Sequence, residues 1–270
     1  MKIEKAVIPA AGYGTRMLPL TKAQPKEMLP VVHKPIIQYV VEEAYYSGIR
    51  EILIITGKHK RAIEDHFDKS DHNVKNEYME ELDRILDDTN IFFVRQREQR
   101  GLGDAVRYAK TFVNGHPFVL LLGDNITMPP CTEYLIKYYN RYHSTIIALE
   151  EVSRENISRH GIVEGKEIEK DVYVLTRLLE KPSPEETESN LAIIGRYVIM
   201  PEIFDILDSL PPGRNNEIQL TDALHELSKQ QAIYGFKYPG ERFDVGNKVD
   251  WLRANLMIAR KYDEFLPAFE

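Results

Sequence analysis

Short apolar runs alternate with amphipathic segments through the first half of the chain. Four brief runs rich in Val, Ile, Leu and Phe predict buried strands at Lys5–Pro9, Glu51–Thr56, Ile91–Arg95 and Phe118–Leu122. Between them, apolar residues recur at helical spacing from Ile36 to Ala44 and stop at Gly48, a residue typical of helix ends. A further helix is predicted over Leu102–Val113. This alternation predicts a Rossmann-like α/β fold, with a mixed, mostly parallel central sheet flanked by helices.

The second half of the chain is richer in strands. We expect strands at 145–152, 161–168, 173–179 and 191–200, and helices near 201–210 and 217–230. A last helix over Trp251–Tyr262 would place on one stripe Trp251, Leu252, Asn255, Leu256 and Ala259. No Gly/Ser linker, low-complexity tract or repeat divides the chain. We therefore expect one domain over residues 1–270, with halves at about 1–143 and 144–250 and a C-terminal helix at about 248–270.

The composition is that of an ordinary globular protein, with 43% hydrophobic and 29% charged residues among 270. A net charge of −7 argues against a nucleic-acid groove, although a few local cations can still dominate a cleft for a small anion. Cys131 is the only cysteine, which excludes an intrachain disulfide and a thiolate metal cluster. The longest apolar stretch, Phe118–Leu122, is too short to cross a bilayer, and the charged N-terminus argues against a secretion signal. We expect a cytoplasmic protein with no nucleic-acid or membrane partner.

The first predicted strand runs directly into a turn that contains Gly12 and Gly14. Glycines let backbone N–H groups approach an anion closely, and the nearby cations Arg16 and Lys26 suit a ligand with several phosphates. The turn is neither of the commoner phosphate loops, because Met17 replaces the third glycine of the dinucleotide fingerprint and no Gly-Lys-Ser/Thr follows. A Gly-x-Gly by itself predicts only a tight turn. Together with the two cations, it predicts a triphosphate site.

The longer pattern is more specific. Gly-x-Gly-Thr-Arg is followed by Pro19, Thr21 and the run Pro25-Lys26-Glu27-x-x-Pro30. This pattern resembles the signature of the sugar-1-phosphate nucleotidylyltransferases, and is most similar to their bacterial branch that acts on UTP and glucose 1-phosphate. The resemblance extends from about Lys5 to Asn247. It implies a nucleotide-diphospho-sugar transferase fold with a β-rich sugar-binding subregion in the second half.

The activity that the resemblance implies is transfer of UMP from UTP to α-D-glucose 1-phosphate. The products would be UDP-glucose and pyrophosphate, formed by in-line attack without a covalent intermediate. The attacking phosphate oxygen is already ionised near neutral pH, so we expect no general base. The groups that the resemblance assigns to catalysis are Arg16, Lys26, Lys181 and Asp124.

The resemblance also implies a set of nucleotide-binding residues: Ala11, Gly12, Gly14, Thr15, Arg16, Lys26, Glu27, Gln96 and Gly101. Arg16 and Lys26 would hold the triphosphate and the pyrophosphate leaving group. Considered alone, the segment 95–103 indicates only a polar, positively charged loop. The resemblance makes it the uracil-reading loop, in which Gln96 offers an acceptor and donors to the imide edge and Gly101 lets the backbone approach.

Two carboxylates are candidate ligands of Mg²⁺, the expected cofactor. Asp124 ends an apolar strand, where it is a suitable ligand for a hard cation, although such an Asp can equally cap the next segment. Asp244 stands beside a second glycine turn. The resemblance implies that both bind Mg²⁺. The sequence departs from the family pattern at Asn125, where a second acid is usual, and at Val245, where a cysteine is usual.

The run Glu180-Lys181-Pro182 ends a predicted strand and by itself could be an ion pair at a sheet edge. The resemblance implies that Glu180 binds the sugar hydroxyls and that Lys181 binds the sugar phosphate. Gly161 would bring its main chain against the hexose, and the preceding His160 is expected to be a pocket wall or surface residue rather than a catalyst. The segment 217–222 also matches this branch, but its helical pattern favours core support.

Two alternatives stay open from the sequence. The chain could act on dTTP or on another hexose 1-phosphate, although the related thymidylyltransferases typically carry Ser-Lys-Gln in place of Pro25-Lys26-Glu27. It could instead be a non-catalytic regulator that binds nucleotide sugars. The charged residues of the predicted site are all present, which argues against that second alternative. Members of the family commonly assemble, so a homodimer or homotetramer is expected.

Overall fold

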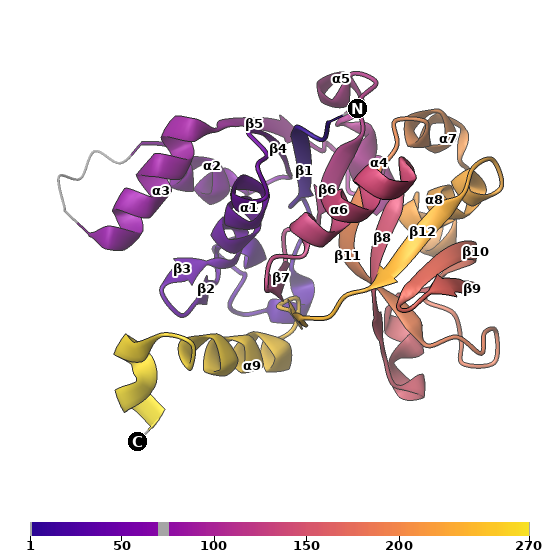
Figure 1. Ribbon diagram of the computed structural model, residues 1–270. Helices are drawn as coiled ribbons and strands as arrows, with labels where there is room; N and C mark the ends of the chain where they lie inside the picture. The colour runs from indigo at the N-terminus through magenta and orange to yellow at the C-terminus, as the bar shows by residue number, and fades with distance from the viewer. Residues whose placement is uncertain (1, 70–75, 270) are drawn as a thin grey trace.

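The computed structural model describes residues 2–69 and 76–269 (Figure 1). A nine-stranded sheet forms its centre, in the order β5-β4-β1-β6-β11-β8-β12-β10-β9. The bounds of these strands are β1 (Lys5–Pro9), β4 (Glu51–Thr56), β5 (Asn90–Arg95), β6 (Phe118–Leu121), β8 (Ile146–Glu151), β9 (Gly161–Glu169), β10 (Val172–Glu180), β11 (Leu191–Ile199) and β12 (Ile233–Lys237). Strands β10 and β11 run antiparallel to the others. The predicted mixed, mostly parallel sheet is confirmed.

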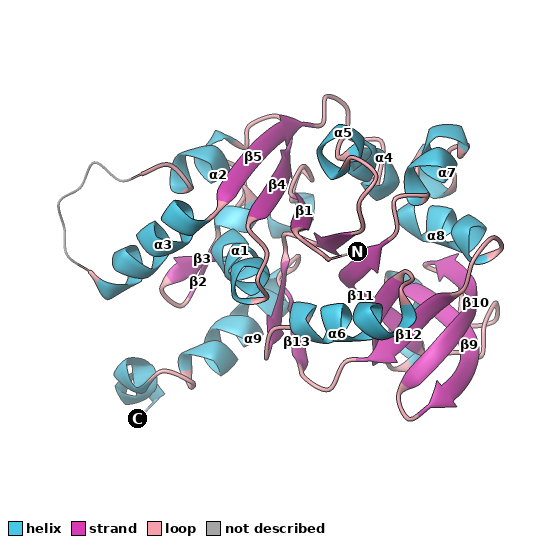
Figure 2. Cartoon of the chain, turned by 45° about the horizontal axis from the view of Figure 1, so that its top comes forward, coloured by secondary structure: helices cyan, strands magenta, loops and turns pink. Residues whose placement is uncertain are grey.

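Helices cover both faces of this sheet, as Figure 2 shows. The side chains of β1 point alternately to the two faces of the sheet, so Ala6 and Ile8 join one buried cluster and Val7 joins the other. The first cluster includes residues of α1 (Ile36–Tyr46), α2 (Arg61–His66), α3 (Glu77–Asp88) and α6 (Thr132–Tyr142). The second includes residues of α4 (Leu102–Arg107), α5 (Lys110–Val113), α7 (Ile203–Ser209) and α8 (Leu220–Ser228). Both faces are therefore apolar and buried at the centre of the sheet, as short continuous apolar strands predict. The prediction of a buried strand at Ile91–Arg95 is wrong, because β5 lies at the edge of the sheet, where Phe92 is 46% and Phe93 36% exposed.

Smaller elements complete the molecule beside the main sheet. Two short ladders pair β2 (Pro30–Val31) with β3 (Lys34–Pro35) and β7 (Asn125–Met128) with β13 (Glu241–Asp244). They pack with α9 (Lys248–Ala259) around a third apolar cluster, and α9 lies apart from the central sheet in Figure 1. In the part of the chain that the structure describes, five 3₁₀ segments lie at Thr15–Met17, Lys26–Met28, Arg154–Arg159, Arg214–Asn216 and Asp263–Phe269. Within residues 2–69 and 76–269, no helix has the length and apolarity that a membrane span needs.

Two predicted helices differ in the structure. The helix expected over 102–113 is divided, because the backbone N–H groups of Tyr108 and Ala109 bond three residues back rather than four, and α4 ends there. The stripe predicted for the last helix is not the one that the structure buries. Leu252 and Leu256 are exposed on α9, and the buried positions are Ala254 and Ile258. Helical spacing allowed either stripe, and packing against the third cluster selected the other.

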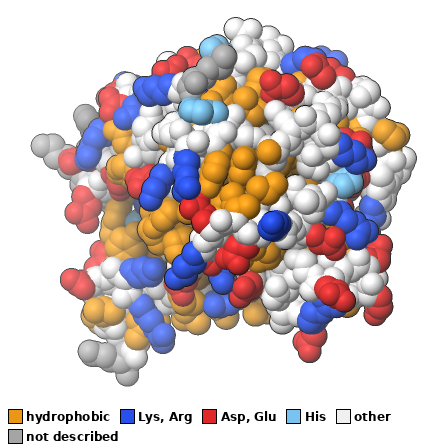
Figure 3. Space-filling model, turned by 45° about the vertical axis from the view of Figure 1, so that its right-hand side comes forward, with side chains coloured by type: hydrophobic (Ala, Val, Ile, Leu, Met, Phe, Trp, Pro, Cys, Tyr) orange, Lys and Arg blue, Asp and Glu red, His pale blue; other side chains and the backbone are white. Residues whose placement is uncertain are grey.

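The surface mixes charges of both signs. On the face in Figure 3, Lys and Arg side chains lie among Asp and Glu side chains, around an area of apolar side chains near the centre. The net charge of −7 is therefore not expressed on this face as a surface of one sign.

The sheet determines where candidate site residues gather. Strands β1, β4, β5 and β6 are parallel neighbours, so their carboxyl ends lie along one edge. The glycine turn follows β1, Gln96 follows β5, and Asp124 follows β6. Ligands of open α/β sheets bind along this edge.

Candidate active site

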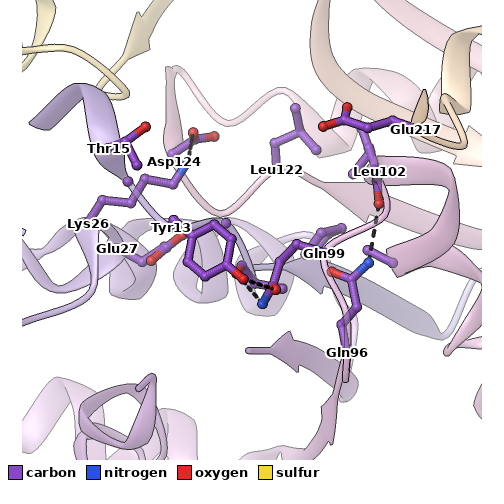
Figure 4. A pocket seen from close by; sticks show the side chains of 16 residues that line it. Tyr13, Thr15, Lys26, Glu27, Gln96, Gln99, Leu102, Leu122, Asp124 and Glu217 are labelled. Carbon is purple, nitrogen blue, oxygen red and sulfur yellow. Dashed lines mark hydrogen bonds and ion pairs between the residues drawn. The ribbon is translucent and has the colours of Figure 1, made fainter. Parts of the chain in front are cut away.

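Two adjoining cavities lie at the carboxyl edge of the sheet. The first has a volume of about 420 Å³ and the second about 780 Å³. They meet at residues that line both: Thr15, Leu102, Leu122, Asp124 and Glu217. The first cavity is drawn from close by in Figure 4. This pairing offers room for two ligands with a shared boundary at Asp124.

The predicted nucleotide-binding residues line the first cavity, except Arg16, which lines the second. The first cavity thus combines Ala11, Gly12, Gly14, Thr15, Lys26, Glu27, Gln96 and Gly101. Gly14 has a φ of +68°, and Gly101 has a φ of +107° with Ile218 O only 2.5 Å from the place of a Cβ. These two turns therefore require glycine. They bring the backbone of both loops to the cavity wall.

One part-buried and one buried ion pair hold the charged wall of the first cavity. Lys26 Nζ contacts Asp124 Oδ2 at 2.5 Å, and Lys60 Nζ contacts Glu27 Oε2 at 2.6 Å. Burial would lower the pKa of Lys26, but the carboxylates of Asp124 and Glu27 outweigh it and raise that pKa. Burial would raise the pKa of Asp124, but Lys26 and Arg16 outweigh it and lower that pKa. Asp124 is therefore ionised, and Lys26 protonated, near neutral pH.

A second buried pair supports the turn that carries Asp124. Arg196 is fully buried and bonds through Nε and Nη2 to the Glu43 carboxylate, at 2.8–3.1 Å. Its guanidinium also donates to the carbonyl oxygens of Leu122 and Asn125, at 3.1 and 2.7 Å. These carbonyls flank Asp124 on both sides. Arg196 therefore connects β11 and α1 to the turn that presents the carboxylate.

The second cavity contains the predicted sugar-phosphate residues Gly161, Glu180 and Lys181. The β9–β10 register pairs Gly161 with Glu180, which brings the two segments together. Glu180 accepts a hydrogen bond from Thr221 Oγ1 at 2.7 Å and contacts Lys181 Nζ at 2.8 Å. Lys181 has a φ of +48°, unusual for a residue other than glycine. His160 lines the same cavity, and burial, with Arg242 nearby, lowers its pKa.

Asp244 also lines the second cavity, beside Asp124. Atoms of three side chains converge on the place where a Cβ on Gly246 would lie. Asp244 Oδ1 and Arg16 Nη2 each lie 2.9 Å from that place, and Asp124 Oδ2 lies 3.4 Å from it. No group of three or more His, Cys, Asp or Glu residues with the arrangement of a metal site occurs among the described residues. Mg²⁺ commonly takes one or two carboxylates and completes its shell with water and substrate phosphates. The two converging carboxylates fit such a site.

Some residues of the cavities were not predicted from the sequence. Glu217 lies at the junction of both cavities, although the pattern of its segment favoured core support. In the first cavity, Tyr13 Oη donates to Gln99 Oε1 at 2.5 Å and joins the glycine turn to the predicted base loop. Arg159 and Arg242 add positive charge to the second cavity. Isolated arginines and glutamines carry no spacing signal, so only the fold could place them.

Comparison with known proteins agrees with this site. The sequence matches the nucleotidyl transferase family over residues 5–261, and the chain belongs to that family. Within it, a UTP–glucose-1-phosphate uridylyltransferase of Streptococcus pyogenes is 46% identical, over 97% of this chain and 91% of that protein. A second such enzyme, from S. pyogenes serotype M3, is 48% identical over 97% of this chain and 92% of its own length. The predicted family is confirmed.

Solved structures show the same relationship. A UDP-glucose pyrophosphorylase complexed with UDP-glucose has a TM-score of 0.92 at 40% identity, covering 96% of this chain and 100% of that one. A UTP-bound UGPase from Acinetobacter baumannii has a TM-score of 0.90 at 33% identity, covering 99% and 97% of the two chains. The likeness extends over the whole fold rather than over one motif. The prediction that the chain is an enzyme of this class is therefore confirmed.

Proposed function

We propose that this protein transfers UMP from UTP to α-D-glucose 1-phosphate, forming UDP-glucose and pyrophosphate. The observation that carries the proposal is the junction of two cavities at Asp124, in a chain 46% identical to an enzyme named for this reaction. The first cavity would bind UTP and the second glucose 1-phosphate. Their shared boundary would then lie where the α-phosphate meets the attacking phosphate.

In the first cavity, the glycine turn and Lys26 would bind the triphosphate. Thr15 and the backbone of Ala11, Gly12 and Gly14 provide polar groups along the turn. Lys26 would move from Asp124 to the phosphates, and Arg16 would bind the pyrophosphate leaving group from the second cavity. The buried Glu27 would hold the turn that carries Lys26. Gln96 and Gly101 would read the base.

In the second cavity, Lys181 would bind the phosphate of glucose 1-phosphate and Glu180 the sugar hydroxyls. Glu180 already has one carboxylate oxygen fixed by Thr221, which leaves a defined acceptor for a sugar. Gly161 would let the main chain approach the hexose. Asp124 and Asp244 would hold Mg²⁺, which when bound neutralises phosphate charge and polarises the α-phosphate.

The chemistry then depends on position and charge. The phosphate oxygen that attacks is ionised, so no side chain needs to remove a proton. Arg16, Lys26 and Lys181 offset the repulsion between two anions, and alignment of the reactants can lower the barrier by roughly 7–11 kcal/mol in favourable systems. Burial, with Arg242 nearby, lowers the pKa of His160 and disfavours its cationic form, and we assign His160 to the wall of the cavity.

The whole chain would act as one unit. We propose that residues 1–143 form a nucleotide half and 144–250 a sugar half of one domain, because the strands of both belong to one sheet.

We also propose a homodimer or homotetramer. Exposed apolar side chains on α9 support assembly: Val249 is 76%, Leu252 55% and Leu256 47% exposed. UTP is a cytoplasmic metabolite, which supports a cytoplasmic location.

The test is a pyrophosphate-release assay with purified protein, Mg²⁺ and a panel of nucleotides and hexose 1-phosphates. We expect UTP with glucose 1-phosphate to be used best and dTTP to be the closest competitor. Thymine keeps the imide edge of uracil and adds one methyl group, worth about 1–3 kcal/mol at most. Equal catalytic efficiency with UTP and ATP, or no UDP-glucose among the products, would refute the proposal.

Gln96→Ala provides a second test of the base assignment. Loss of the Gln96 side chain should lower the ratio of kcat/KM for UTP to kcat/KM for CTP. Binding of the nucleotide phosphates should be weakened less. Size-exclusion chromatography with light scattering tests assembly separately. Leu252→Lys should reduce the mass of the oligomer in this measurement. Arg253→Lys, which replaces one exposed cation by another at the next position, should not.

A further inference from the structure

The side-chain amide of Gln96 has two ends of opposite hydrogen-bonding character, and the end that faces the cavity determines which base it can read. In the structure its nitrogen is engaged. Nε2 donates to Asp104 Oδ2 at 2.8 Å and to the carbonyl oxygen of Gly101 at 3.3 Å. Oε1 accepts no hydrogen bond from any residue that the structure describes. In Figure 4 a dashed line leaves the amide nitrogen of Gln96, and the amide oxygen points the other way, toward Gln99, which also lines the cavity.

The Asp104 carboxylate can hold the Gln96 amide only with the amide nitrogen toward it. Its side chain is 1% exposed, so the solvent cannot replace its partners. An ionised carboxylate accepts hydrogen bonds and cannot donate them, so Gln96 must present its nitrogen to it. The other oxygen of Asp104 accepts from Arg100 Nη2 at 3.1 Å and lies 3.8 Å from Arg107 Nη1. The Asp104 carboxylate thus lies between Gln96 and two arginines.

We propose that Asp104 is a positioning residue for base specificity, which acts by fixing Gln96 with its oxygen toward the base. The inference rests on the proposed function, because it takes the base to be uracil. Uracil carries a hydrogen on N3 and can donate it to Gln96 Oε1. Cytosine has a lone pair at N3, which would face the lone pairs of that oxygen. A reversed amide would offer a donor to cytosine instead, so Asp104 decides between the two bases.

The same reasoning states what Asp104 does not do. Thymine carries the same N3 hydrogen as uracil, so a fixed Gln96 accepts both. Discrimination between UTP and dTTP must then come from elsewhere in the cavity. A single variant therefore contains its own control. If the Gln96 amide is held less firmly, the preference for UTP over CTP should change, and the preference for UTP over dTTP should not.

Asp104→Asn tests the inference. Asparagine has nearly the same shape but can present either an oxygen or a nitrogen to Gln96, so both orientations become available. We expect the ratio of kcat/KM for UTP to that for CTP to fall at least tenfold. That change corresponds to about 1.4 kcal/mol, comparable to one hydrogen bond. The UTP to dTTP ratio and the KM for glucose 1-phosphate should stay within twofold.

Two controls separate positioning from general damage. Arg100→Gln removes the half-exposed partner of Asp104 but leaves the contact with Gln96, so the UTP to CTP ratio should persist. In a Gln96→Leu background, Asp104→Asn should change that ratio no further, because the group it positions is gone. Asp104→Ser, whose hydroxyl also donates or accepts, provides a second variant should Asp104→Asn not fold by circular dichroism.

A folded Asp104→Asn or Asp104→Ser enzyme that keeps the wild-type UTP to CTP ratio would overturn the inference. An equal loss of efficiency with UTP, CTP and dTTP would also overturn it, because that pattern indicates only a structural role. Failure of the proposed function is read on the wild-type protein instead, as absence of UDP-glucose synthesis or of any preference for UTP over CTP.

Discussion

The two cavities differ in how their charged groups are held. In the first, the side chains of Lys60 and Glu27 pair at 5% and 1% exposure, and Lys26 pairs with Asp124 behind the glycine turn. In the second, the Lys181 side chain is 44% exposed and reaches its partner Glu180 from the surface. A buried ion pair is desolvated and loses its side-chain conformational entropy when the chain folds. An exposed lysine is desolvated and ordered only when it binds a ligand. The first cavity is preorganised and the second is adaptable.

Removing one member of the buried pair should have the largest effect on stability. Lys60→Met leaves the Glu27 carboxylate buried without its partner, and we expect a loss of about 3–5 kcal/mol in the free energy of unfolding. Urea denaturation at pH 7 measures this loss. In the double variant Glu27→Gln with Lys60→Met, much of it should return, because no charge stays buried alone. Lys181→Met is the matched control and should change stability by less than about 0.5 kcal/mol. Equal losses in the two lysine variants would contradict the comparison.

The carboxylates at the junction should have the largest effects on turnover. We expect Asp124→Asn to lower kcat by about 10²–10³, the range seen when one charge-stabilising group is removed from other enzymes. Asp244→Asn should have a smaller effect, because Asp244 is more exposed than Asp124 and its contact with Arg242 is longer, at 3.6 Å. Steady-state rates over a Mg²⁺ titration measure both. Near-normal rates for both variants at low Mg²⁺ would place the metal site elsewhere.

Lys181→Ala should separate the two cavities in binding. We expect the KM for glucose 1-phosphate to rise by about tenfold to a hundredfold, since a hydrogen bond to a charged group contributes about 1.5–3 kcal/mol. UTP affinity by isothermal calorimetry should be unchanged, because Lys181 lines only the second cavity. A fall in UTP affinity as large as that of Lys26→Ala would assign Lys181 to the nucleotide instead.

The smallest effect concerns pH and the second cavity. The folded pKa of His160 is lowered by burial, so between that pKa and the usual value near 6.5 the unfolded chain binds more protons than the folded one. Stability therefore rises with pH through this window and is lost as pH falls below about 6.5. Urea unfolding at several pH values should show this loss reduced in His160→Asn. Identical pH profiles for the two proteins would show that His160 is not the group involved.

Prediction from the sequence was most successful at positions where the local backbone conformation requires one residue type. Gly14 and Gly101 have positive φ values, a conformation that glycine adopts without strain, and they stand at turns recognisable from the sequence. The apolar runs that predict the strands were equally local, and the parallel direction of β1, β4 and β6 follows from their alternation with helices. The division of α4 from α5 was missed, because the change from four-residue to three-residue hydrogen bonding leaves no mark on apolar spacing.

The sequence by itself determined the family, the α/β sheet, the motif that contains Lys26, and the ends of the strands that precede Gln96 and Asp124. These follow from periodicity and from motifs within a few residues of each other. Only the tertiary structure decided which side chains pair across long separations. It placed Arg196 beneath the Asp124 turn, Asp104 against the nitrogen of Gln96, and the apolar stripe of Leu252 and Leu256 on the outside of α9. Such contacts depend on burial and direction in space, which spacing along a chain does not encode.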